Sequence, residues 1–460
     1  AQRRGYLTQS FNQHDGYSSS IVVGPELESN NLVFRLVGES AVSGTVTDEQ
    51  GDSVRNAQVM LFQNMQAGGA RMTYPRATST TDDEGFYRFG HLPAGKYFVA
   101  VSAEPWYAQH YSPPAVAYTS SADTVVVPSE EPQQSPLDVA YPVTFYRGET
   151  DAATATAIVL GKGEQVSIDI SLFPVPALHV RITTENPEQD RQAYISLDQK
   201  LFDGARIGVR TQTIQVAPGA TEIVGIPPGR YNMRINNSGK EPQTQEREVE
   251  IGGNGDLENS RGSTRVPVTA TVHFESLAPA GQMSILLRAK KSTQVFNERV
   301  DAKGEAEFKQ GGVPPGTYEI SLQGQGPFIK SISATGARVT GRTLEIKDGG
   351  PVKLVLETAL GEGTITGTAL RGDKPVAGAM VVLVPNDPGN NLVLFRRDQS
   401  DSDGTFLLAN AVPGHYTVVA IEDGWDLEWG NPDVLNKFMP QGEVVVVERH
   451  GKYSVKVKVQ

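Results

Sequence analysis

The sequence of 460 residues contains no cysteine. This absence excludes disulfide bonds, thiolate nucleophiles and zinc sites built from cysteine. Long apolar runs are missing as well, because no stretch of about 18 apolar residues occurs anywhere in the chain. We therefore expect no segment to insert into a membrane as a helix.

Basic residues are fewer than acidic ones. Lysine and arginine together number 41, against 53 aspartates and glutamates, which gives a net charge of −12. No basic block is present that could neutralise a run of phosphates. Nucleic acid and anionic membrane surfaces are therefore excluded as main partners.

Helical periodicity is missing too. No window repeats apolar residues roughly every 3.6 positions, and the best candidate, residues 433–438, is about one turn long. The 47 glycines and 29 prolines suit short strands joined by tight turns. Because one core rarely serves more than roughly 250–300 residues, the sequence predicts an all-β chain of several domains.

Catalytic motifs are not found. The seven histidines follow neither His-x-x-Glu nor His-Glu-x-x-His spacing, so no metallopeptidase centre is indicated. Residues 82–85 and 401–404 resemble the start of calcium loops but lack the distal glutamate, and ordinary acidic-glycine turns explain them. We predict no enzyme, no cofactor and no metal site. An enzymatic hypothesis would depend on residues that meet only in space.

A short phrase of proline, glycine and tyrosine, here called the Pro-Gly-x-Tyr turn, is present four times, and in its first copy Ala94 separates the proline from the glycine. It occupies residues 92–97, 226–231 and 313–318, and returns in shortened form at 412–416. Proline presets φ, glycine supplies a conformation that other residues resist, and the tyrosine opens an apolar-alternating run. Each copy therefore predicts a turn that begins a strand.

Each repeat has two parts. The head holds a first strand, an acidic-glycine turn and the Pro-Gly-x-Tyr turn, and the tail holds two later strands on either side of a glycine. The first head contains Gly-Thr-Val at 44–46, an acidic-glycine turn at 48–52 and the Asp-x-x-Gly-x-Tyr-x-Phe type of pattern at 82–89, and residues 363–421 repeat this series. The series resembles the carboxypeptidase regulatory-like domain over 41–101 and 363–421, while 177–357 share only the Pro-Pro-Gly-x-Tyr turn and its flanking strands. The resemblance implies a non-catalytic, seven-stranded prealbumin-type β-sandwich. Such domains are frequent in bacterial secreted and surface proteins and are related to starch-binding-like folds.

The repeat predicts a tandem array of immunoglobulin/prealbumin-like β-sandwich domains. The domains are expected at 1–37 (a partial sandwich of tail strands), 38–173 (a complete sandwich with an insert at 112–141), 174–265, 266–358 and 359–460. The insert is rich in proline, serine and alanine, and we expect an extended arm there.

The first 37 residues look like a tail without its head. Residues 20–23, Gly24 and residues 32–36 follow the pattern of the later tails. A tail alone would expose apolar side chains and strand edges, which invite pairing with another chain. The candidate subunit-interface residues are Ile21, Val23, Leu32, Phe34 and Leu36. Three explanations stay open: a remnant of an upstream domain, completion by another subunit, or packing on the chain's own first domain.

Aromatic residues follow two of the tyrosine-initiated strands. Planar rings can stack on sugar faces, but aromatic side chains are also enriched at protein interfaces. The candidates for either role are Trp106, Tyr107, Tyr111, Trp425 and Trp429. The sequence does not separate a glycan platform from an interface.

The leading hypothesis is a non-catalytic, extracellular structural protein of a bacterial surface that associates with copies of itself into a filament or surface layer. The alternative is a carbohydrate-binding or adhesion module, with polysaccharide as the partner. Both hypotheses place the protein outside the cell.

Overall fold

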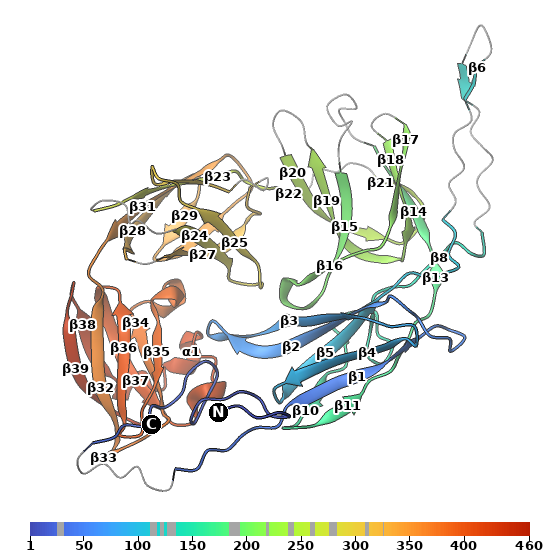
Figure 1. The fold of residues 1–460 in the computed structure, drawn as a ribbon. Helices are drawn as coiled ribbons and strands as arrows, with labels where there is room; N and C mark the ends of the chain where they lie inside the picture. Colours follow the sequence, from blue (N-terminus) through green and yellow to red (C-terminus); the bar gives the residue numbers. More distant parts are fainter. Residues whose placement is uncertain are drawn as a thin grey trace. The chain divides into compact units, whose positions relative to one another are not determined.

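The computed structural model describes residues 1–24, 32–110, 117–119, 124–126, 135–183, 194–217, 220–237, 243–257, 263–275, 283–308, 312–324 and 326–460. The fold is all-β, as predicted, and consists of β-sandwiches in tandem (Figure 1). The chain divides into two compact units. Unit 1 contains Ala1–Glu39, Met65–Met72 and Val266–Gln460, and unit 2 contains Ser40–Asn64 and Thr73–Arg265.

The first sandwich, in unit 2, is built around strand β1. One sheet places β4 on one side of β1 and β11 and β12 on the other, and the second sheet has the order β10-β5-β2-β3 with β9 also paired to β5. The two sheets enclose a core that includes Val42, Leu61 and Tyr97. The strands are β1 (Ser40–Thr47), β2 (Gln58–Ala67), β3 (Ala70–Thr80), β4 (Phe86–Leu92), β5 (Gly95–Ser102), β9 (Thr144–Phe145), β10 (Ile158–Leu160), β11 (Gln165–Ser167) and β12 (Ile170–Ser171).

Within the predicted insert at 112–141, the structure describes three short strands. They are β6 (Ala117–Thr119), β7 (Thr124–Val126) and β8 (Val139–Ala140). Strands β6 and β7 pair with each other, and β8 pairs with β13 (Val175–Pro176), which leads into the second sandwich. The remainder of the predicted arm, residues 112–116, 120–123 and 127–134, lies outside the described residues.

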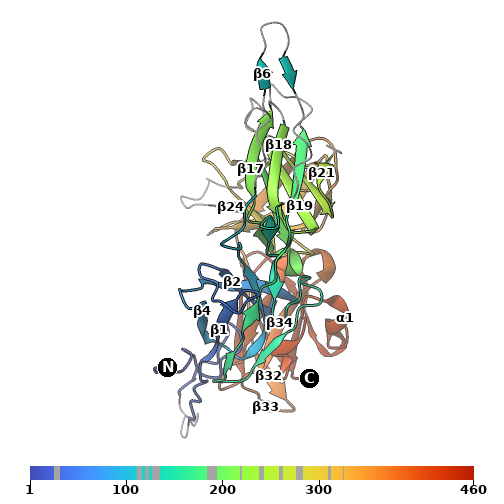
Figure 2. The same cartoon turned by 90° about the vertical axis from the view of Figure 1, so that its right-hand side faces the viewer.

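The second sandwich, also in unit 2, has sheets in the orders β17-β18-β14-β21 and β16-β15-β19-β20-β22. Strands β17 and β18 lie side by side in Figure 2. The strands are β14 (Leu178–Thr183), β15 (Tyr194–Lys200), β16 (Arg206–Gly208), β17 (Gln212–Ala217), β18 (Ala220–Ile226), β19 (Gly229–Asn237), β20 (Gln243–Ile251), β21 (Gly255–Leu257) and β22 (Ser263–Thr264); a 3-10 turn, η1, occupies Phe202–Gly204.

The third sandwich, in unit 1, has sheets in the orders β26-β23-β31-β28 and β25-β24-β27-β30-β29. Ile285 and Leu356, from the two sheets, are fully buried in its core. The strands are β23 (Val268–His273), β24 (Ser284–Ala289), β25 (Val295–Arg299), β26 (Glu305–Glu307), β27 (Gly316–Gln323), β28 (Phe328–Thr335), β29 (Arg338–Thr340), β30 (Thr343–Ile346) and β31 (Val352–Ala359).

The fourth sandwich, also in unit 1, pairs β32 with β33, β36 and β39 in one sheet and orders the other as β35-β34-β37-β38. Its strands are β32 (Gly363–Arg371), β33 (Lys374–Pro375), β34 (Met380–Pro385), β35 (Arg396–Gln399), β36 (Thr405–Ala411), β37 (Gly414–Ile421), β38 (Glu443–Val447) and β39 (Lys452–Lys458). Its short helical pieces are α1 (Pro432–Leu435) and the 3-10 turns η2 (Pro388–Asn390), η3 (Leu392–Leu394), η4 (Gly424–Asp426) and η5 (Met439–Gln441).

Heads and tails meet in one sheet of each sandwich. The first strand of the head pairs in parallel with a late strand of the tail: β1 with β11 and β12, β14 with β21, β23 with β31, and β32 with β39. A tail strand therefore depends on its own head for hydrogen-bond partners. The exact domain boundaries drawn from the sequence stay a prediction.

The Pro-Gly-x-Tyr turns begin four strands, as predicted, since β5, β19, β27 and β37 each start at the turn glycine. In each case the tyrosine hydroxyl donates to the carbonyl oxygen four residues earlier, at O–O distances of 2.8, 2.5, 2.6 and 2.7 Å. The turn glycines do not adopt positive φ, contrary to the expectation. A Cβ at Gly229 or Gly316 would stand 3.2 Å from the tyrosine hydroxyl oxygen, which is a tight contact, whereas at Gly95 and Gly414 the nearest ring atom, at 3.5 and 3.4 Å, would be in ordinary contact.

Candidate functional site

The N-terminal segment, residues 1–39, does not form the strands expected at 20–23 and 32–36. Its described part, 1–24 and 32–39, contains only the isolated bridges Tyr6–Gly38 and His14–Tyr17. The physical reason is that the backbone donors and acceptors around Ser20 bond to the β35–β36 turn, so they are not available for a strand ladder. Polar groups of residues 12–22 bond to residues 399–402 of the fourth sandwich.

The N-terminal segment packs on the fourth sandwich of the same chain, at the turn between β35 and β36 (Figure 1). The backbone N–H of Ser20 donates to Asp401 Oδ1 at 2.5 Å, and Ser402 N–H donates to the Ser20 carbonyl at 3.1 Å. Val22 N–H donates to Ser402 Oγ at 2.9 Å. Extended backbone is therefore bound beside a turn by alternating donors and acceptors.

Gln399 is the polar centre of this contact. Its Nε2 donates to the Asn12 carbonyl at 2.5 Å and to Ser19 Oγ at 2.9 Å, and its side chain lies beside His14, with 3.1 Å between Oε1 and Nδ1. Ser19 Oγ in turn donates to the Ser400 carbonyl at 2.8 Å. Gln399 is 1% exposed, so removal of these partners would leave a buried amide unsatisfied.

Trp425 is the apolar centre of the same contact. The His14 ring stacks on its indole at 5.2 Å and 8°, and the Tyr17 ring lies tilted at 5.6 Å. Trp425 Nε1 donates to the Gly378 carbonyl at 3.1 Å. Trp425 is only 8% exposed, and an aromatic contact of this geometry contributes about 0.5–1.5 kcal/mol beyond its buried area.

Arg397 adds charge to the contact. Its guanidinium lies 5.0 Å from the ring centre of Tyr17 and 4.4 Å from that of Trp429, and its Nη1 is 3.9 Å from Asp15 Oδ2. Partial burial raises the pKa of Asp15, and the positive charge of Arg397 opposes that shift. Trp429, like Trp425, is buried, at 7% exposed.

The five candidate interface residues stay largely uncovered. Ile21, Val23, Leu32 and Phe34 are exposed by 40%, 71%, 46% and 40%, and Leu36 is half-buried. The Phe34 ring has one aromatic neighbour, Phe11, at 6.2 Å. The structure thus brings Phe34 to Phe11 but assembles no cluster of all five. Their role in a subunit interface stays a prediction.

The candidate aromatics fall into two groups. Trp106 is 86% exposed and meets Tyr107 edge-on at 5.7 Å, while Trp425 and Trp429 are buried in the fourth sandwich. Tyr107 donates to Glu49 Oε1 at 2.5 Å, and burial together with this bond raises the pKa of Tyr107 to about 12. Tyr111 lies outside the described residues.

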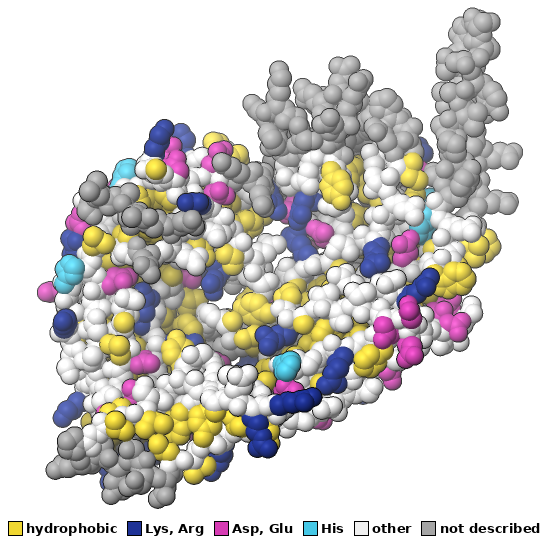
Figure 3. All heavy atoms as spheres, viewed as in Figure 1, with side chains coloured by type: hydrophobic (Ala, Val, Ile, Leu, Met, Phe, Trp, Pro, Cys, Tyr) yellow, Lys and Arg dark blue, Asp and Glu magenta, His cyan; other side chains and the backbone are white. Residues whose placement is uncertain are grey.

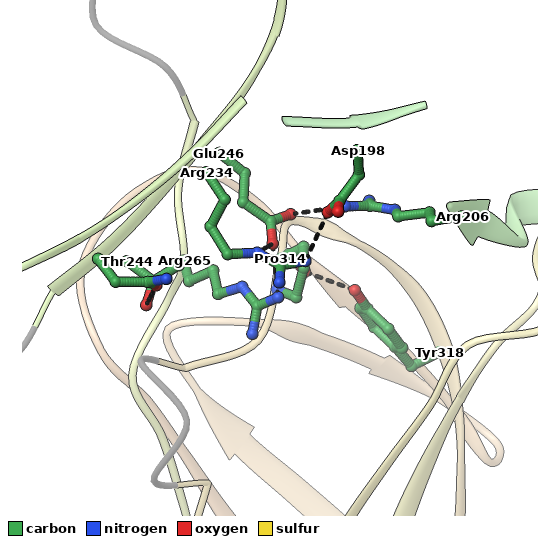
Figure 4. Close-up of polar contacts among 9 residues, drawn as sticks. Asp198, Arg206, Arg234, Thr244, Glu246, Arg265, Pro314 and Tyr318 are labelled. Atoms are coloured by element: carbon green, nitrogen blue, oxygen red, sulfur yellow. Dashed lines mark hydrogen bonds and ion pairs between the residues drawn. The ribbon is translucent and has the colours of Figure 1, made fainter. Parts of the chain in front are cut away.

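An ionic network lies on the sheet β16-β15-β19-β20-β22 of the second sandwich. The sequence analysis did not predict it. Figure 4 shows Arg206, Arg234 and Arg265 around Glu246, with Asp198 beside them. Glu246 Oε1 accepts from Arg265 at 2.6 Å and from Arg234 at 2.9 Å. Burial alone would raise the pKa of Glu246, but the three arginines hold it below its ordinary value.

A second missed cluster joins the base of the insert to the second sandwich. Asp138 lies between two imidazoles, 2.8 Å from His110 Nδ1 and 2.8 Å from His179 Nε2. All three side chains are at most 15% exposed. The residues are too far apart in the sequence for spacing to have indicated the cluster.

No metal centre is found among the residues that the structure describes, since no group of three or more suitable side chains converges there. The carboxylates of the acidic-glycine turns accept backbone N–H groups instead, within the turn or, for Asp401, from Ser20. Asp82 Oδ1 accepts from the N–H groups of Glu84 and Phe86, and Asp403 Oδ1 accepts from Thr405. In the described part of the chain, no helix is long and apolar enough to cross a membrane. On the face in Figure 3, basic and acidic side chains are interspersed.

The family comparison supports the first sandwich. Residues 41–128 match the family model for the carboxypeptidase regulatory-like domain, which confirms the resemblance drawn from the head motifs. The match lies within the first of the four sandwiches, and over 363–421 the resemblance stays a prediction. No curated protein matches the chain.

Solved structures match at low similarity. The Bacillus anthracis TIE protein is 14% identical, with 94% of this chain and 75% of that chain covered and a TM-score of 0.16. The Streptococcal ancillary pilin is 11% identical, with 61% and 98% covered and a TM-score of 0.20. The RrgB pilus protein of Streptococcus pneumoniae is 9% identical, with 92% and 98% covered and a TM-score of 0.17. At such TM-scores these likenesses carry no argument about function.

Proposed function

We propose that this protein is a non-catalytic structural protein of the bacterial surface or extracellular space, and that copies of it associate through the N-terminal segment. In the assembled form, the N-terminal segment of one copy occupies the β35–β36 turn of the next copy. Each copy then offers one segment and one receiving turn, so the contact joins two different surfaces. Such a heterologous contact generates a filament unless it closes into a ring.

The observation that carries this proposal is the contact at Gln399 and Trp425. It joins residues 380 positions apart in the chain, through side chains that an identical copy would present unchanged. Exchange of an identical element between copies is a low-cost route to assembly, since every lost bond is regained. The carboxypeptidase regulatory-like match supports the location, because that domain is frequent in bacterial secreted and surface proteins.

Sedimentation velocity of the full chain over a range of concentrations tests the association. Gln399→Ala removes the amide that bonds Asn12 and Ser19, so we expect its oligomers to dissociate more readily than those of the wild type. Gln441→Ala, at an exposed position of the same sandwich, is the matched control and should leave association unchanged. A wild-type protein that sediments as one monomeric species at every concentration would contradict the proposal.

Carbohydrate binding is the second candidate function, and the exposure of Trp106 is what favours it. An exposed indole offers a flat apolar face for a sugar ring. Retention on a polysaccharide column that Trp106→Ala abolishes would support this function. A wild-type chain that passes through a broad panel of glycans unretarded would rule it out.

A further inference from the structure

An open groove of about 400 Å³ lies in unit 1, lined by β28 and the β29–β30 turn of the third sandwich and by loop residues of the fourth. One part of its lining is apolar and includes Phe328, Leu394 and Val412. Phe328 and Val412 belong to a small hydrophobic cluster that is separate from the cores of both sandwiches, and Leu394 packs both against this cluster and against the core of the fourth sandwich. The other part of the lining is basic, with Lys330, Arg342 and Arg449.

Arg342 is the unusual member of this groove. It is only 7% exposed, and its Nη2 donates to the Ile329 carbonyl. Its position is fixed by its own backbone, whose N–H donates to the Asn390 carbonyl at 2.8 Å. Among the described residues, no carboxylate forms an ion pair with it. Burial lowers the pKa of Arg342, but a guanidinium stays charged in proteins, so its remaining donors can pair with an anion that enters the groove.

Arg449 and Lys330 add to the positive charge. Arg449 is already engaged, because its two terminal nitrogens bond the Glu275 carboxylate at 2.9 and 2.5 Å and its Nε donates to the Leu360 carbonyl at 2.9 Å. Lys330 is exposed at the groove. Three cations therefore face one resident carboxylate, and the groove carries an excess of positive charge.

We propose that this groove binds a carboxylate carried by an apolar peptide segment, with Arg342 as the primary anion contact and Lys330 as a second one. Arginine matches the planar geometry of a carboxylate through paired N–H donors, and such bonds are roughly twice as strong as neutral ones. The apolar half of the lining favours a peptide side chain over a sugar acid, because sugar hydroxyls would be left without partners there. This site is distinct from the N-terminal segment and its receiving turn.

Ligand-observed NMR of the full chain tests the site, with N-acetylleucine as the probe and its uncharged amide, N-acetylleucinamide, as the matched ligand control. We expect the acid to bind and the amide to bind at least about tenfold more weakly, since the anion contact is lost. Addition of salt should weaken the acid and leave the amide unchanged.

Substitutions of the groove residues test whether N-acetylleucine binds in the groove. Arg342→Met should abolish binding of the acid, and Lys330→Ala, at an exposed position that does not threaten folding, should weaken it several-fold. Lys347→Ala, an exposed lysine of the same sandwich outside the groove, is the control and should bind as the wild type does. Equal binding of acid and amide, binding unaffected by both groove variants, or tighter binding of glucuronate or inorganic phosphate than of N-acetylleucine would each overturn the proposal.

Discussion

Glu246 shows how one side chain depends on its surroundings. It lies on β20 opposite Arg234, and two further arginines reach it from β16 and from the end of β22. Taking a carboxylate out of water is costly, and the three guanidinium groups offset that cost. Sequence pattern alone could not indicate this network, because its members are spread over 60 positions and none forms a motif.

The first prediction concerns Glu246→Gln. We expect it to lower the free energy of unfolding of the second sandwich by about 1–3 kcal/mol, because three partly buried arginines lose their shared counter-charge. The pKa of Glu246 is depressed in the fold, so its contribution is present above the ordinary value of 4.5 and is lost as pH falls through the folded-state pKa. The difference between variant and wild type should therefore shrink on acidification.

Glu250→Gln on the same strand is the matched control. Among the described residues Glu250 pairs with Arg230 alone, and both side chains are at least 74% exposed, so urea denaturation should hardly change. Equal unfolding curves for Glu246→Gln and Glu250→Gln would show that the network does not stabilise the sandwich.

At the scale of elements, the fold depends both on the turns that begin strands and on the pairing of each head strand with its tail strand. The strands that follow Pro-Gly-x-Tyr, and the tail strands at 158–160, 352–359 and 443–447, could be predicted from alternation and turn residues alone. The role of the turn glycines could not, because it depends on the return of a tyrosine ring. Gly44 was also beyond prediction, since its constraint comes from a residue 124 positions later.

The second prediction concerns Gly44→Ala in β1. A Cβ at Gly44 would stand 1.9 Å from the carbonyl oxygen of Ile168, where the tail strand approaches between β11 and β12. We expect a loss of about 1–3 kcal/mol in unfolding free energy, because the tail must move away to admit the methyl group. Hydrogen exchange should place the loss in β1 and its tail partners.

Gly90→Ala in β4 is the control for this prediction. No atom lies within 4 Å of a Cβ at that position, so the added methyl group should be tolerated. Native-like protection of β1 and its tail partners in Gly44→Ala would mean that the close approach is not a constraint. Gly367 holds the equivalent position in the fourth sandwich, where an added Cβ would stand 2.4 Å from the Val455 carbonyl oxygen.

At the scale of the whole molecule, the chain connects its first residues to its last sandwich. The tail-like pattern at 20–36 led to an expectation of strands, and none forms in the described part, where the backbone near Ser20 bonds to the β35–β36 turn instead. What the pattern did indicate was a segment in need of a partner. The partner surface, with Gln399 and Trp425 at its centre, could not be foreseen from sequence because no local motif marks it.

In a single copy, the N-terminal segment is tethered to its receiving turn, and tethering supplies an effective concentration that is typically millimolar for short flexible linkers. Exchange between copies should therefore grow with protein concentration. Since the chain contains no cysteine, a pair of introduced cysteines can record which copy supplies the segment.

The most direct measurement is oxidative cross-linking of a variant that combines Ser20→Cys and Ser402→Cys, at neighbouring backbone positions joined by a hydrogen bond of 3.1 Å. Ser402→Cys alone is the control and can give at most dimers. On a non-reducing gel, association through the N-terminal segment predicts a ladder of dimers and longer species whose share rises with protein concentration during oxidation. A single band of internally bridged monomer at every concentration would contradict it.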